Sequence, residues 1–69
     1  MPTFEQIEVL QSLCYIHKKT GYIISDFEIF YPGCSECVIR VVFHKENVDE
    51  KPKTILVYAS GSYIEDNYG

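Results

Sequence analysis

The segment that most constrains this sequence is residues 37–45, CVIRVVFHK, which contains neither glycine nor proline. Its β-branched and aromatic side chains favour a strand, because such side chains lose rotamer freedom in a helix. Alternate strand residues point to opposite faces. One face therefore carries only apolar residues, namely Cys37, Ile39, Val41 and Phe43. The opposite face is half apolar, which is more than solvent exposure requires, and carries Val38, Arg40, Val42 and His44.

The length and composition predict one folded domain, residues 1–69, with 46% hydrophobic residues. A chain of this size buries only ~60% of its unfolded surface, so a partner, a metal or oligomerisation is a plausible source of added stability. The net charge of −4 argues against direct nucleic-acid binding, which requires a basic surface. The charge is also small for a protein that imitates DNA.

Several observations predict a cytoplasmic protein, in the host cytoplasm if the source is viral. The first residues, MPTFEQIEVL, lack the basic flank of a signal peptide. No apolar run approaches the ~20 residues that a membrane-spanning helix requires. The three cysteines are an odd number, which indicates free thiols in a reducing compartment.

The N-terminal segment predicts an amphipathic helix over residues 4–20. Thr3 and Gln6 have the spacing of a capping box, and Gly21 stands where a left-handed C-terminal cap belongs. At 100° per residue, one arc collects the apolar side of this helix. The arc contains Ile7, Leu10, Leu13, Cys14 and His17, with Val9 and Ile16 along one flank.

Alternating apolar residues predict two further strands, over residues 22–31 and 54–60. Pro32–Gly33 and the charged segment 46–53 read as the connections of hairpins. The register of the last strand and the path of the tail, 61–69, stay open at this point. The expected fold is α+β, with the N-terminal helix packed on one face of a three-stranded antiparallel meander (α-β-β-β), and residues 37–45 form the middle strand.

Two pairs of residues have the spacing of a metal site, Cys14-x-x-His17 and Cys34-x-x-Cys37. Three sulfurs and one imidazole suit tetrahedral zinc, and a small domain gains stability from such an ion. A thiol-redox role for Cys34 and Cys37 is another alternative, although no helix N-terminus is expected there to lower a thiol pKa. We favour ordinary structural roles, with Cys14 as a small buried residue, and we predict no cofactor, with structural zinc as the alternative.

We predict no enzymatic activity, because a domain of this size offers little depth for a water-excluding site. The same-face carboxylates of Asp26 and Glu28 could imitate phosphates, but a solvated strand face explains them better. The second face of the sheet is instead the candidate site, because it mixes aromatic, aliphatic and Arg side chains, as interface cores do. Its predicted partner-binding residues are Tyr22, Ile24, Asp26, Glu28, Phe30, Arg40, Val42 and His44.

The alternative is that the tail folds back over this face through Tyr63, Ile64 and Tyr68. With the face open, we expect a small acidic protein-interaction domain that blocks or modulates a partner protein and forms a homodimer. In general style it is similar to small phage-encoded inhibitors of host or defence machinery. That resemblance is one of class and rests on size, acidity and the lack of catalytic motifs.

Overall fold

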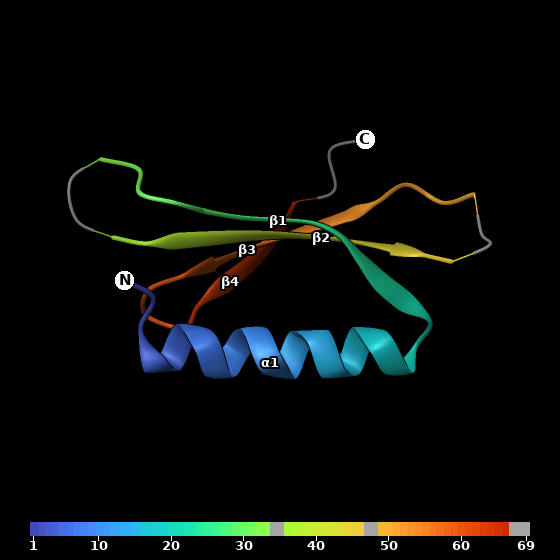
Figure 1. Cartoon of the computed structure of the whole chain (residues 1–69), viewed down its shortest axis with the longest axis horizontal. Helices are drawn as coiled ribbons and strands as arrows, with labels where there is room; N and C mark the ends of the chain where they lie inside the picture. Colours follow the sequence, from blue (N-terminus) through green and yellow to red (C-terminus); the bar gives the residue numbers. More distant parts are fainter. Residues whose placement is uncertain (34–35, 47–48, 67–69) are drawn as a thin grey trace.

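The computed structural model describes residues 1–33, 36–46 and 49–66, and its one helix lies across one face of an antiparallel sheet (Figure 1). The α+β class is therefore confirmed. The elements are α1 (Phe4–Lys19), β1 (Tyr22–Phe30), β2 (Val38–Lys45), β3 (Lys53–Tyr58) and β4 (Tyr63–Asp66). The strand order is β1-β2-β3-β4. In the part of the chain that the structure describes, no helix is both long and apolar enough to cross a membrane.

The prediction of three strands was wrong, because the tail adds β4 to the edge of β3. The reversal occurs in a tight turn, in which the Tyr58 N–H donates to Ser62 O over 2.8 Å and Gly61 has φ +91°. This positive φ favours glycine. The residues of β4, Tyr-Ile-Glu-Asp, do not alternate between apolar and polar, so the sequence gives no strand pattern in the tail.

The ends of α1 follow from its capping residues. The predicted capping box is confirmed: Thr3 Oγ1 accepts from the Gln6 N–H over 3.1 Å, and Gln6 Oε1 accepts from the Thr3 N–H over 3.2 Å. Thr3 Oγ1 also donates to Ala59 O, so the start of the helix is tied to the turn that follows β3. Gly21, with φ +93°, takes the expected left-handed conformation just after the helix.

The core lies between α1 and the middle of the sheet, as the composition of residues 37–45 predicts. Ile39, Val41 and Phe43 of β2 are at most 2% exposed. They pack with Leu13 of α1 and with Ile55 and Val57 of β3. Burial of one such large apolar side chain contributes roughly 1.5–3 kcal/mol. Strand β2 thus occupies the interior of the sheet, with β1 on one side and β3 on the other.

Gln6 lies on the apolar arc of α1, but its polar side chain gives no sign of burial in the sequence. Its side chain is 0% exposed and lies among apolar core residues. Its Nε2 donates to Cys37 O over 2.8 Å and to Val57 O over 2.9 Å. One amide therefore joins the first turn of α1 to the backbones of β2 and β3, and all its polar atoms are hydrogen-bonded, as burial requires.

A β-bulge interrupts the pairing of β1 with β2. The register runs from Tyr22 opposite Lys45 to Ile24 opposite Phe43, skips Ser25, and resumes with Asp26 opposite Val42. The Ser25 Oγ donates to Val42 O over 3.3 Å. The extra residue reverses the inside–outside alternation on its two sides, and this reversal changes the composition of both sheet faces.

Candidate interaction surface

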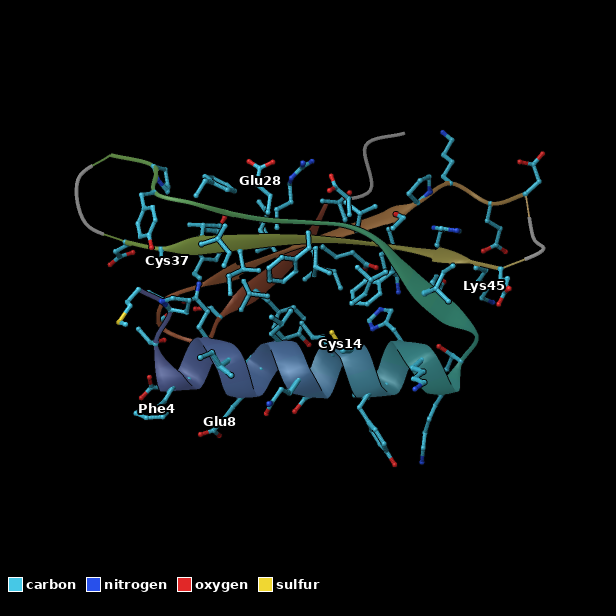
Figure 2. The ribbon with its side chains drawn as sticks, in the orientation of Figure 1. Phe4, Glu8, Cys14, Glu28, Cys37 and Lys45 are labelled. Carbon is cyan, nitrogen blue, oxygen red and sulfur yellow. The ribbon has the colours of Figure 1, made fainter. Side chains whose placement is uncertain are left out.

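The sheet face opposite α1 is the candidate functional surface, here called the uncovered face. In the parts of the chain that the structure describes, no helix or further strand lies over it (Figure 1). Glu28 projects from this side, away from α1, whereas Cys14 points from the helix towards the sheet (Figure 2). By the strand register, the uncovered face consists of Ile23, Asp26, Glu28, Phe30, Val38, Arg40, Val42, His44, Thr54, Leu56, Tyr58 and Ile64.

Arg40 organises the polar centre of the uncovered face. Its guanidinium lies 3.0 Å from a carboxylate oxygen of Glu28 and 3.3 Å from one of Asp26. All three side chains are more than one third exposed, so each ion pair contributes roughly 0–1 kcal/mol to stability. The pairs act mainly by orienting the guanidinium at the middle of the face.

An apolar row crosses the face next to this cluster. Phe30, Val38 and Tyr58 are consecutive register partners on β1, β2 and β3. Val38 is only 3% exposed, since a large ring stands on either side of it, while Phe30 and Tyr58 are half-buried. The side chains at this end of the face are therefore closely packed against one another.

The structure brings six of the eight predicted partner-binding residues together on the uncovered face: Asp26, Glu28, Phe30, Arg40, Val42 and His44. The placement of Tyr22 and Ile24 on this face was wrong, because the Ser25 bulge turns both towards the helix side. Tyr22 packs there against the core, with its ring centroid 5.2 Å from that of His17. Ile23 takes the vacated position beside His44.

The third-strand register, open from the sequence, adds Leu56 and Tyr58 to the uncovered face. The described tail does not fold over this face, because β4 continues the sheet alongside β3. Tyr63 lies on the helix side opposite Val57, and Ile64 lies at the rim of the uncovered face, 50% exposed. Tyr68 lies outside the described residues.

Of the residues considered for zinc, His17 has both ring nitrogens near other groups. Its Nδ1 is 2.6 Å from Leu13 O, and its Nε2 is 3.4 Å from Lys53 Nζ. Its ring stacks on Phe43 at 4.3 Å. Cys37 is buried, burial raises the pKa of the Cys14 thiol, and Cys34 lies outside the described residues. Among the residues that the structure describes, no cluster of three or more His, Cys, Asp or Glu is arranged to hold a metal ion.

A shallow hollow lies on the helix side of the sheet, between α1 and Tyr63 of β4. It has a volume of ≈ 270 Å³ and is lined by Glu8, Val9, Ser12, Leu13, Ile16 and Tyr63. A second hollow of ≈ 230 Å³ adjoins it and contains the His17–Lys53 contact, with Lys53 also 3.1 Å from Glu65. Lys53 and Glu65 are paired with each other at this depression, and most of its other lining residues are apolar.

Comparisons with protein-family models, with curated proteins and with solved structures find no match to this chain.

Proposed function

We propose that this chain is a small protein-interaction module that binds a partner protein through the uncovered face. The observation that carries the proposal is a four-stranded sheet with α1 on one side only, so that a broad face with an Arg at its centre and aromatic rings beside it has no cover among the described elements. Interface cores are enriched in Arg, aromatic and aliphatic residues in this way.

The mechanism of such a module is steric. A face whose side chains are already packed loses little side-chain entropy on docking, because Phe30, Val38 and Tyr58 restrain one another before the partner binds. The guanidinium of Arg40 is held in place by Asp26 and Glu28 before the partner arrives. The exposed carboxylates of Asp26 and Glu28, on the edge strand β1, affect the association rate more than the affinity. Occupation of the partner's functional surface then blocks or modulates that partner, in the cytoplasm and in the style of a phage-encoded inhibitor.

A pull-down with three forms of the protein tests the proposal. The bait variant Val42→Lys places a charge in the middle of the uncovered face, and Gln11→Lys makes the same charge change at an exposed position of α1. We expect wild type and Gln11→Lys to retain the same host protein and Val42→Lys to lose it. Both variants are first shown to melt cooperatively. A captured set that is identical for all three forms would refute the use of this face.

A further inference from the structure

Strand β1 forms an open edge of the sheet. It is nine residues long and pairs only with β2 among the described strands. Nearly all of it is accessible: Ile24, Phe27 and Ile29 are 49%, 47% and 43% exposed. Edge strands are usually short or carry charges, Pro or a β-bulge, because their free backbone groups recruit other strands. Strand β1 has a bulge at Ser25, but the segment beyond it, from Phe27 to Phe30, contains no Pro or Lys and has Glu28 as its one charged residue.

The hydrogen-bonding direction along β1 follows from two contacts. Val42 O is directed at β1, since it accepts from Ser25 Oγ, so its register partner Asp26 directs its own backbone groups back towards β2. Alternation then turns the N–H and C=O groups of Phe27 and Ile29 outwards. The Phe27 N–H accordingly donates to the Asp26 side chain over 2.9 Å. The outward groups and the exposed apolar side chains thus belong to the same residues.

We propose that this edge pairs with β1 of a second copy, antiparallel, about a two-fold axis at Ile29. This register sets Ile29 opposite Ile29 and Phe27 opposite Tyr31, so apolar side chains meet on the helix side. It also sets Glu28 opposite Phe30 rather than opposite a carboxylate. An axis at Phe27 would place Asp26 opposite Glu28, and an axis at Glu28 would place that residue opposite itself, and like charges in these positions repel.

The second copy is the occupant that these features select. The edge requires a partner strand with outward backbone groups at the same spacing, apolar residues at alternate positions on the helix side and no carboxylate opposite Glu28. The segment from Phe27 to Tyr31 meets all three requirements when it is rotated by a two-fold axis. Pro32 opposes Asp26 at a position where backbone groups point away from the interface, so its missing N–H removes no hydrogen bond.

A two-fold axis perpendicular to the sheet keeps both helices on one side. The two four-stranded sheets become one sheet, and the two uncovered faces join into a single surface with the Arg40 clusters near the junction. This inference deepens the proposed function and rests on it for the use of the joined surface. The pairing itself can be tested without any foreign partner.

The experiment measures the mass of the full chain in solution by light scattering after size exclusion. We expect wild type at twice the 8.0 kDa of one chain. Ile29→Lys brings two ammonium groups together at the axis and should halve that mass. Ile64→Lys, the matched control on the opposite edge strand β4, should leave it unchanged, since Ile64 is similarly exposed. Circular dichroism establishes that both variants are folded.

Amide hydrogen exchange provides a second readout. Dilution of wild type through its dissociation range should accelerate exchange at Phe27 and Ile29 and leave the interior strand β2 unaffected. A monomeric wild type at all concentrations, a dimer that survives Ile29→Lys, or a dimer lost in Ile64→Lys would each overturn the proposal. These outcomes are separate from the pull-down: a dimer that captures no partner refutes the proposed function, and a monomer that still captures one refutes only the pairing.

Discussion

Substitution of Gln6 is the sharpest test of how this small core is held together. The Gln6 amide donates to Cys37 O and Val57 O and is fully buried. A Leu at this position keeps the apolar volume but leaves the two carbonyls without this donor. A buried polar group without a partner costs about 1–3 kcal/mol, so Gln6→Leu should lower the free energy of unfolding by about 2–4 kcal/mol, including the lost half of the capping box.

Gln6→Glu should lower the free energy of unfolding more than Gln6→Leu does at neutral pH, and part of that loss should be recovered in acid. A carboxylate at this site faces two carbonyl oxygens in a buried environment, and both effects raise its pKa above the ordinary value of about 4.3. The protonated acid can still donate one hydrogen bond. The variant is therefore relatively most stable below the unfolded-state pKa and loses stability as the pH rises through the folded-state pKa. If the pKa rises by about two units, the loss between pH 4 and pH 7 is about 2.4 kcal/mol.

Urea denaturation followed by circular dichroism at pH 4 and pH 7 measures this difference. The control is Gln11→Glu, which makes the same chemical change at an exposed position of the same helix. Its use cancels the pH dependence of the rest of the chain. Total stability for this length is only about 3–10 kcal/mol, so the midpoint urea concentration of Gln6→Glu should be clearly lower at pH 7 than at pH 4. A pH-independent cost, or one equal to that of Gln11→Glu, would refute the role assigned to this amide.

Three further outcomes are expected. Gly61→Ala should lower the free energy of unfolding, measured by urea denaturation, more than Gly33→Ala does. Both residues have positive φ, but a Cβ at Gly61 would lie 3.3 Å from a side-chain atom of α1, whereas the site at Gly33 is open. Phe43→Ala should lower the free energy of unfolding by about 3–5 kcal/mol, because it leaves a cavity in the core. Phe4→Ala, at an 83% exposed position, should change it by no more than about 0.5 kcal/mol. Burial raises the pKa of the Cys14 thiol, so less thiolate is present at neutral pH. Iodoacetamide should therefore modify Cys14 more slowly in the folded chain than in urea, and mass spectrometry measures the two rates. Equal rates would contradict this expectation.

Metal analysis addresses the zinc alternative directly. The nitrogens of His17 already contact Leu13 O and Lys53, so we expect protein purified without chelator to carry no zinc and EDTA to leave its thermal melting unchanged. Stoichiometric zinc, with melting lowered by EDTA, would instead support the site predicted from Cys14, His17, Cys34 and Cys37.

The local sequence was sufficient to predict the helix, the middle strand and the packing of one against the other. The capping box at Thr3 and Gln6 is a local sequence pattern. The apolar face of residues 37–45 can be removed from water only in a core. For the same reason most of the uncovered face was predictable, since alternation over Arg40, Val42 and His44 is uninterrupted. Both signals depend on neighbouring residues alone.

Tertiary structure alone decided which face of the sheet Tyr22 and Ile24 occupy and that the tail adds a fourth strand. A bulge at Ser25 has no distinctive composition, and it arises from the pairing of β1 with β2. The residues of β4 lack the alternation of a strand, and they form one because they pair with the edge of β3. Gln6 is polar in sequence and buried in space because two carbonyls of distant strands converge on it. Periodicity records only which residues share a face, whereas these features depend on which segments meet across the fold.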